Sequence, residues 1–362
     1  MRAVRKSEGT VRVLAVLGVA AALLASPALA AEKPSTPGED MMMQASKLAE
    51  TDQVAALALM RKAAATGDPE AINGLAGFRA MGVGAPADQV EATALYEQAI
   101  ARGSKAAASN LGRRLLLDDD PANDARAVAL LTPLAQDRML APTVWYPMGR
   151  AMLFGQSGRE PDLKGGMHLL ESAESREPDN ADLFFLLGRG HQAGWGERTR
   201  DPVRAAKYFK HSADLGDERA QWYYGMALLN GEGVRQDVAG AWTWVRKSAE
   251  GGYVQGQIST AVMLAVGQGV AENDAEARDW YRKAAEQRSA HALRGLGLMM
   301  MTGEGGPVDL LTGQTYAEMA REGGDRNAGA MLQQLGRTLS VEDRRKAEQI
   351  KIDWKRKFGD PR

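Results

Sequence analysis

A turn motif that recurs along most of the chain constrains the fold more than any other feature of this sequence. The stretch LLNGEGVRQDVAGAWTWVRKSAEGG at residues 228–252 holds one copy, in which a Gly-Glu-Gly-Val turn leads into an amphipathic segment. Equivalent turn positions recur every 36 to 39 residues, at Gly82, Asp118, Gly155, Gly194, Gly231, Gly267 and Gly303. Recurrence at this interval indicates a repeat architecture and not a single phosphate-binding loop.

Two further series keep the same phase as the turns. Six or seven residues after each turn stands an acid or amide suited to cap a helix, namely Asp88, Asp124, Asp162, Asp201, Asp237, Asn273 and Asp309. Four residues further on, six of the seven units carry Ala or Gly, and the second unit has Val128. Each unit is therefore predicted to hold a helix A, a glycine turn in the left-handed region, a capped helix B and a short return.

These series predict an all-α fold without strands. We expect a right-handed α-solenoid of about seven helix-turn-helix repeats over residues 43–338, closed by a C-terminal capping helix and a basic tail over residues 339–362. Ser340 and the acid at Asp343 form a variant capping box for that last helix. Its apolar face would carry Ala347, Ile350 and Trp354, which cover the core of the last repeat.

The combined pattern resembles the Sel-one-like repeats, which are close relatives of the tetratricopeptide repeats. The pattern is A-x(3)-L-G-x(2)-Y/L-x(2)-G-x-G-V-x(2)-D-x(3)-A-x(2)-W-x(2)-K-A/S-A, and residues 220–252 and 256–287 follow it most closely. The resemblance covers roughly residues 50–335, although residues 105–160 lack the second turn glycine. It implies a stack of helix pairs with a partner-binding groove lined by the A helices.

The resemblance also implies which residues face this groove. In the related tetratricopeptide geometry the residue after the helix-A glycine points into the groove, and here these residues are Arg113, Arg150, Arg189, Met226, Val262 and Leu298. The groove position four residues earlier gives Tyr146, Phe185, Trp222 and Ile258. An arginine ladder followed by an apolar floor would suit a partner segment with acidic residues at one end and apolar ones at the other. Alternatively, the arginines pair with acids on neighbouring helices and Trp222 belongs to the core.

The N-terminal residues predict export. Four basic residues precede the apolar run VLAVLGVAAALLA at residues 13–25, and small residues before Ala31 suit a signal peptidase, so residues 1–30 form a predicted signal peptide with cleavage near Ala30. The alternative is a permanent N-terminal anchor. Residues 31–42 are polar and contain proline, which predicts a flexible leader. The mature protein is expected to be periplasmic or secreted, with no stable membrane insertion.

Composition excludes several classes of function. The absence of cysteine excludes disulfides, thiolate metal sites and a cysteine nucleophile. The whole chain has a net charge of −1 and residues 1–30 contribute +3, which leaves the mature chain near −4 and disfavours nucleic acid as a partner. The basic cluster at residues 355–357 is interpreted as a solvated tail.

The sequence predicts no catalytic, cofactor or metal site. The four histidines are scattered, and His191 occupies a helix-A position where a packed or hydrogen-bonded histidine is expected. No serine is followed three residues later by lysine, and Gly-x-Ser-x-Gly is missing. The acidic run at residues 118–120 lacks the spacing of a calcium loop, and consecutive methionines on a helix point in different directions.

These observations leave three functional hypotheses. The first is an exported scaffold or adaptor that binds a protein partner in envelope assembly, secretion or signalling. The second is a solenoid that binds a glycan or peptidoglycan strand, and the third is an envelope hydrolase or penicillin-binding enzyme. Surface aromatics along the groove would favour a glycan, whereas mixed charged and apolar stripes would favour a protein.

Overall fold

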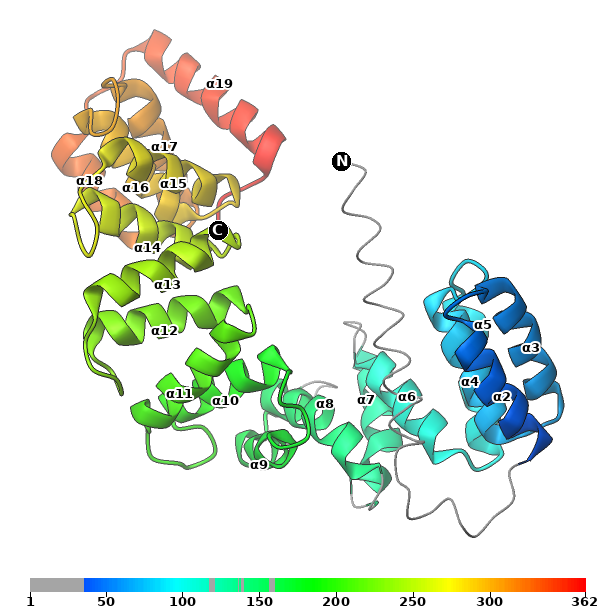
Figure 1. The fold of residues 1–362 in the computed structure, drawn as a ribbon. Helices are drawn as coiled ribbons and strands as arrows, with labels where there is room; N and C mark the ends of the chain where they lie inside the picture. Colours follow the sequence, from blue (N-terminus) through cyan, green and yellow to red (C-terminus); the bar gives the residue numbers. More distant parts are fainter. Residues whose placement is uncertain (1–35, 117–120, 136, 138–139, 156–159) are drawn as a thin grey trace. The chain divides into compact units, whose positions relative to one another are not determined.

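The computed structural model describes residues 36–116, 121–135, 137, 140–155 and 160–362, and within these ranges it contains helices and no strand. The chain divides into two compact units, residues 1–172 and residues 173–362. In each unit, consecutive helices pack against one another as antiparallel pairs in chain order (Figure 1). The predicted all-α repeat fold is confirmed.

The first unit contains four helix pairs. Its elements are α2 (Pro37–Leu48), α3 (Gln53–Ala65), α4 (Pro69–Met81), α5 (Gln89–Ala101), α6 (Lys105–Leu115), α7 (Pro121–Leu131), the 3-10 turn η1 (Thr132–Leu134), α8 (Ala141–Phe154) and α9 (Leu163–Ala173). Even-numbered helices are the A helices and odd-numbered ones the B helices. A core that includes Ile72, Leu111, Leu131 and Val144 runs between these pairs.

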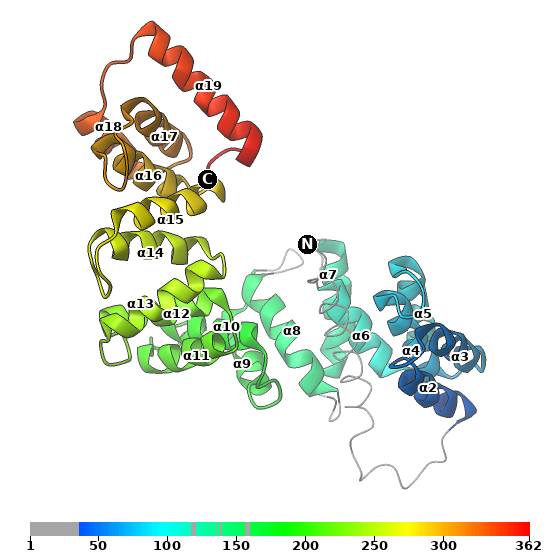
Figure 2. The same cartoon turned by 45° about the horizontal axis from the view of Figure 1, so that its top comes forward.

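The second unit continues the same alternation. Its helices are α10 (Ala181–Ala193), α11 (Pro202–Asp214), α12 (Glu218–Asn230), α13 (Val238–Glu250), α14 (Val254–Ala265), α15 (Asp274–Glu286), α16 (Ala290–Thr302), α17 (Leu310–Glu322), α18 (Arg326–Leu335) and α19 (Val341–Phe358). Figure 2 shows the helices from α10 to α17 stacked in sequence order, with α19 alongside α17. Each pair from α10·α11 to α16·α17 follows the predicted plan.

The N-terminal boundary of the repeats differs from the prediction. Helix α2 begins at Pro37, so the second half of the expected flexible leader, residues 37–42, is helical. The cause is a capping box: the Thr36 hydroxyl accepts a hydrogen bond from the Glu39 N–H at 3.1 Å, and the Thr36 N–H donates to the Glu39 carboxylate at 2.7 Å. The pair α2·α3 therefore adds a repeat before the seven that were predicted.

The predicted turn glycines adopt left-handed backbone angles. Their φ values are 76° at Gly82, 63° at Gly155, 74° at Gly194, 72° at Gly231, 65° at Gly267 and 85° at Gly303. A residue with a Cβ atom is disfavoured at these positive φ angles, so the backbone conformation of the turn requires the first glycine. The remaining predicted turn residue, Asp118, lies outside the described residues.

The second turn glycine is required by packing. A Cβ at Gly233 would lie less than 3.0 Å from the carbonyl oxygen of Pro202, the first residue of α11. Gly269 approaches Val238, the first residue of α13, in the same way. At these turns the second glycine thus allows backbone contact with helix B of the preceding repeat.

The predicted capping residues also close the turns. In α13 the Asp237 carboxylate accepts a hydrogen bond from the Gly240 N–H at 2.9 Å, and the Asp237 N–H donates to the Leu228 carbonyl of α12 at 2.9 Å. Equivalent caps are formed at Asp88, Asp162, Asp201, Asn273 and Asp309. The prediction is wrong at Asp124, which lies inside α7 because that helix begins at Pro121, a residue favoured in the first turn.

The C-terminal helix follows its prediction in part. The Ser340 hydroxyl accepts a hydrogen bond from the Asp343 N–H at 3.0 Å. Helix α19 packs on α17, where Trp354 is buried and its ring centroid lies 5.0 Å from that of Tyr316. The basic residues 355–357 are exposed, as expected, but they lie in the last turn of α19 and not in a tail beyond it; cations are favoured at a helix C-terminus. Beyond the helix, the Arg362 N–H donates to the Arg288 carbonyl at 2.8 Å.

Candidate functional site

The predicted groove residues fall into both units. Arg113 on α6 and Tyr146 and Arg150 on α8 belong to the first unit, whereas the second contains Phe185, Arg189, Trp222, Met226, Ile258 and Leu298 on α10 to α16. The arginine ladder expected from Arg113 to Arg189 is therefore divided between units that are described separately. Of the predicted groove residues, those on α10 to α16 lie together within one unit.

The arginines of the first unit are half-buried on their helices. The positive charges of Arg114 and Arg113 oppose the effect of burial, which raises the pKa of the Tyr96 hydroxyl. The guanidinium of Arg150 lies 6.0 Å from the ring of Phe154, one turn along the same helix. These contacts do not assemble a common site in the first unit.

Five half-buried side chains gather on three A helices of the second unit. We name them the α10–α12–α14 surface; it consists of Arg189, Arg219, Trp222, Tyr223 and Tyr253. Tyr253 is the residue that precedes α14. The surface therefore spans three consecutive repeats.

A buried aromatic base fixes the position of Tyr223. Phe209 of α11 is buried and stacks on the Tyr223 ring, with centroids 4.8 Å apart and planes inclined by 22°. Phe185 meets the same ring edge-on at 5.7 Å. Such ring pairs add about 0.5–1.5 kcal/mol each beyond the area they bury, so Tyr223 is held in one orientation.

Trp222 joins two repeats. Its indole Nε1–H donates a hydrogen bond of 2.8 Å to the Ser259 hydroxyl on α14. Its ring meets Tyr223 at 4.9 Å and Tyr253 at 6.1 Å, both at steep angles. The side chain is half-buried, so it is neither a free surface residue nor a member of the closed core.

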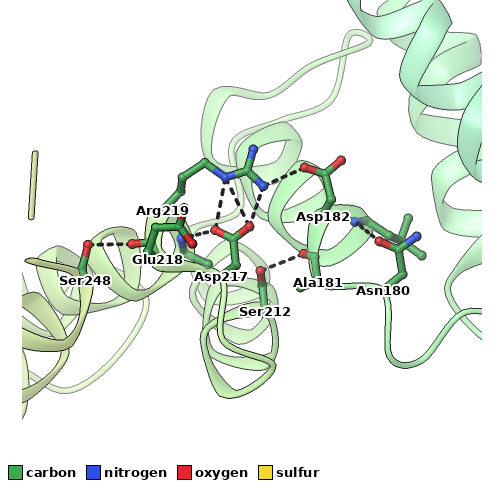
Figure 3. Close-up of polar contacts among 10 residues, drawn as sticks. Asn180, Ala181, Asp182, Ser212, Asp217, Glu218, Arg219 and Ser248 are labelled. Atoms are coloured by element: carbon green, nitrogen blue, oxygen red, sulfur yellow. Dashed lines mark hydrogen bonds and ion pairs between the residues drawn. The ribbon is translucent and has the colours of Figure 1, made fainter. Parts of the chain in front are cut away.

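Arg219 is fully engaged by acids. Figure 3 shows its guanidinium between Asp217 and Asp182, with a 2.7 Å bond to Asp182 and 3.2 Å bonds to both carboxylate oxygens of Asp217. The guanidinium also lies 4.1 Å from the Phe185 ring. Burial lowers the pKa of Arg219, but the hydrogen bonds that it donates to Asp217 and Asp182 reverse this effect and raise the pKa overall. The positive charge is therefore neutralised within the protein.

Arg189 differs from Arg219. Its Cζ lies 4.9 Å from the Tyr223 ring, its Nε is buried without a hydrogen-bond partner, and it forms no ion pair with a described residue. The alternative that the groove arginines pair with neighbouring acids therefore does not describe Arg189. Among the described residues, the group that faces its charge is the Tyr223 ring.

Aliphatic side chains continue the surface toward α14 and α16. Val262 is 40% exposed and Val266 63% exposed, while Met226 and Leu298 are half-buried. Two positions that were expected to be exposed anchors are buried, Phe185 at 7% and Ile258 at 6% exposure. Arg219 of the next repeat covers Phe185, and Ile258 packs into the core that α16 completes.

Other features that bear on chemistry are structural. His191 is 3% exposed and stacks on the Tyr208 ring at 5.5 Å, as expected for a packed histidine. Among the described residues, no three acidic or histidine side chains gather closely enough to hold a metal ion. In the same part of the chain, no helix has both the length and the apolar composition needed to cross a membrane.

Sequence reasoning missed Arg219, Tyr223 and Tyr253. A signal for the first was present, because Arg219 and Asp182 both occupy the second position of a helix A and carry opposite charges. Tyr253 lies in a return segment, where the repeat pattern predicts no groove position.

Comparisons with known proteins agree with this architecture. The family model for the Sel1 repeat matches residues 42–68, 69–104, 185–217, 218–253, 254–289 and 290–325, which together exceed half of the chain. No protein with a curated description matches the sequence.

Solved structures of similar fold include the following two. A Sel1 repeat protein from Oxalobacter formigenes is 24% identical with a TM-score of 0.57, and the match covers 88% of this chain and 99% of that one. A protective antigen of uropathogenic Escherichia coli strains that displays an SLR fold is 19% identical with a TM-score of 0.59, covering 89% of this chain and 77% of that one.

Proposed function

Because this chain belongs to the Sel1 repeat family, a family of repeats that generally serve protein–protein interaction, we propose that it is an exported scaffold for a protein partner. The α10–α12–α14 surface is the proposed binding site. Helix-pair repeats present extended surfaces made by successive A helices, and binding to them requires no catalytic group. The processes proposed are envelope assembly, secretion or signalling.

The observation that carries this proposal is that Arg189 forms no ion pair with a described residue and lies beside half-exposed aromatic rings. Arginine, tyrosine and tryptophan dominate the residues that contribute most to protein interfaces. Here all three types meet on one surface, and Arg189 has no acidic partner of its own. The neighbouring Val262 and Val266 add exposed apolar area that water solvates poorly.

A solenoid that binds a glycan is the second candidate. The half-exposed rings of Trp222, Tyr223 and Tyr253 are the observation in its favour. The mixed charged and aliphatic character of the surface favours a protein instead. An envelope hydrolase or penicillin-binding enzyme has no support from the described residues, since neither sequence nor site offers an activated nucleophile.

Site-specific photo-crosslinking tests the proposed site. Val262 would be replaced by the photoreactive amino acid p-benzoylphenylalanine in the producing cell, and Val203 would serve as the matched control. Val203 is also exposed, at 64%, but lies at the start of the B helix α11. We expect one defined protein adduct from position 262 and none from position 203. Equal labelling of both positions, or no adduct at all, would contradict the proposal.

Export is tested separately. Its support is the sequence of residues 1–30, which lie outside the described residues, and its alternative is a retained anchor. Cell fractionation followed by intact-mass measurement should place the protein outside the cytoplasm with a new N-terminus near Ala31. A full-length mass in the membrane fraction would support the anchor.

A further inference from the structure

The α10–α12–α14 surface has a chemical preference that follows from the difference between its two arginines. We propose that it recognises a carboxylate on an extended polypeptide segment of the partner, with Arg189 as the residue that binds it. This inference rests on the proposed function and names the chemistry of the partner.

The first step concerns charge. Arg219 is neutralised by Asp182 and Asp217, whereas Arg189 has an aromatic ring beside it and no anion. A guanidinium offers five N–H donors; in Arg189 the Nε–H is buried without an acceptor, whereas the terminal Nη groups reach the surface. A carboxylate supplied by a partner would accept two of these terminal donors at once.

The second step concerns additional donors. The hydroxyls of Tyr223 and Tyr253 form no hydrogen bond with another described residue, although both rings are fixed by aromatic contacts. Burial raises the pKa of Tyr253, the nearby Tyr223 raises it further, and Arg189 and Arg219 lower it. Both tyrosine rings contact the Trp222 ring, with centroids 4.9 Å and 6.1 Å away, and Arg189 lies over the Tyr223 ring. Two phenol O–H groups on this surface are therefore available, beside Arg189, as donors to an anion.

The third step distinguishes a polypeptide from an acidic sugar. Trp222 is held by ring contacts and by its bond to Ser259, so its polar edge is already occupied. The exposed side chains that follow are Val262 on α14 and Val266 directly after it, and they offer no hydrogen bonds to sugar hydroxyls. They do suit apolar side chains of a peptide. The predicted recognition element is thus a carboxylate followed within a few residues by an apolar side chain.

The fourth step concerns how rigid the donors are. Phe209 fixes Tyr223 from below, and Tyr223 in turn supports Arg189. Preorganised donors lose little conformational entropy when a ligand arrives. The surface is therefore suited to direct binding of a carboxylate without rearrangement.

Fluorescence anisotropy with defined peptides tests the inference. The probes would be fluorescein-labelled ten-residue peptides of Gly, Ser and Thr that carry one Asp followed two to four residues later by Leu, titrated with the purified full chain. Matched peptides would carry Asn for Asp or Ser for Leu. A labelled oligogalacturonate would test an acidic sugar as the source of the carboxylate.

Four variants separate charge from folding. Arg189→Glu should weaken binding of the Asp–Leu peptides by at least about tenfold, because a cation becomes an anion at the carboxylate site. Arg189→Lys should retain part of the affinity, since lysine keeps the charge but not the paired donors. Arg204→Glu, an exposed residue of α11 that pairs only with Asp201, should leave binding unchanged. Val262→Ser should weaken the Leu-containing peptides and not their Ser counterparts.

Each outcome decides a separate point. Equal binding of the Asp and Asn peptides, or unchanged binding by a folded Arg189→Glu variant, would overturn the carboxylate inference. Preference for oligogalacturonate over every peptide would replace the polypeptide by a sugar acid. A crosslinked protein at position 262 combined with an inert Arg189 would leave the scaffold function intact and remove only this inference.

Discussion

Arg219 on helix α12 donates a 2.7 Å hydrogen bond to Asp182 on helix α10, 37 residues earlier in the chain. Both residues occupy the second position of a helix A, so the ion pair joins equivalent positions of adjacent repeats. In addition, Arg219 covers the ring of Phe185. The ion pair therefore holds α10 and α12 side by side at one edge of the proposed binding site.

The Arg219–Asp182 pair should contribute modestly to stability. Because the Arg219 side chain is 37% exposed, water screens the charge, and a double-mutant cycle with Arg219→Met and Asp182→Asn should give a coupling of about 0.5–1 kcal/mol. Urea unfolding would measure it. A coupling near zero would show that Asp217 alone holds the arginine.

The two glycines of one turn should differ in their tolerance of a side chain. Gly231 and Gly233 have almost the same φ, 72° and 71°, so Ala is conformationally strained at both. At Gly231 the new Cβ would lie 3.5 Å from its nearest neighbour, whereas at Gly233 it would meet the Pro202 carbonyl. Gly231→Ala should cost about 1–2 kcal/mol, from strain alone. Gly233→Ala should cost roughly 2–5 kcal/mol, from strain and steric overlap.

Thermal and urea unfolding of the two variants would check this difference. Each is the control for the other, because the substitution and the backbone angle are the same. Equal destabilisation would mean that the contact with the preceding repeat is easily relieved.

Two buried serines link the helices of a repeat. The hydroxyls of Ser212 and Ser248 donate to the carbonyls of Ala181 and Glu218, at 2.8 Å and 2.6 Å (Figure 3). Ser248→Ala should cost about 0.5–1.5 kcal/mol, since it removes one hydrogen bond without creating a large cavity. Alanine is accommodated at Ala284, one repeat further on, with no exposure.

Hydrogen exchange at the start of α12 would locate the effect of Ser248→Ala. The matched control is Thr243→Ala on the exposed side of the same helix. If the two substitutions were equivalent, the serine hydroxyl would contribute nothing beyond its neighbours.

The fourth prediction concerns pH. Partial burial and then Arg294 lower the pKa of His291 below 6.5, and the opposing effect of Asp325 is smaller. Because the His291 side chain is 54% exposed, the effect on stability should be small. Between this lowered value and 6.5 the unfolded chain binds more protons than the folded one, so stability falls as pH decreases through that window.

His291→Gln should remove this part of the acid destabilisation while leaving the contribution of the carboxylates. Urea unfolding of both proteins at about pH 7.5 and about pH 5 would measure it, because histidine changes its charge in this range. If the difference between the proteins were the same at both values, the folded state would not disfavour the imidazolium.

Local signals predicted much of the fold. The turn glycines and most caps follow from backbone conformation and from hydrogen bonds within a few residues of Asp237 and its equivalents. The pair α2·α3 was missed because Ala49–Asp52 connects its helices without the turn glycine. Its signal was Asp52, which caps α3 one repeat length before Asp88.

The site was less predictable, because burial there depends on the next repeat. Phe185 satisfies the groove pattern in its own repeat, but Arg219 and Tyr223 of the following repeat pack against its ring. Likewise, Arg189 and Arg219 are the same amino acid, yet two carboxylates distinguish them. Spacing identifies equivalent positions; it does not show which of them neighbouring side chains have already occupied.

The contact of each second turn glycine with the preceding helix B affects how such a chain can change length. Gly233 meets the first residue of α11, and Gly269 meets the first residue of α13 in the same manner. If the repeat α12·α13 were removed, Gly269 would meet Pro202 and the same backbone contact would form again. Deletion of one residue from a turn would instead misplace the glycine. Gene duplication and loss can therefore extend or shorten the molecule in complete units, while each copy accumulates its own A-helix side chains.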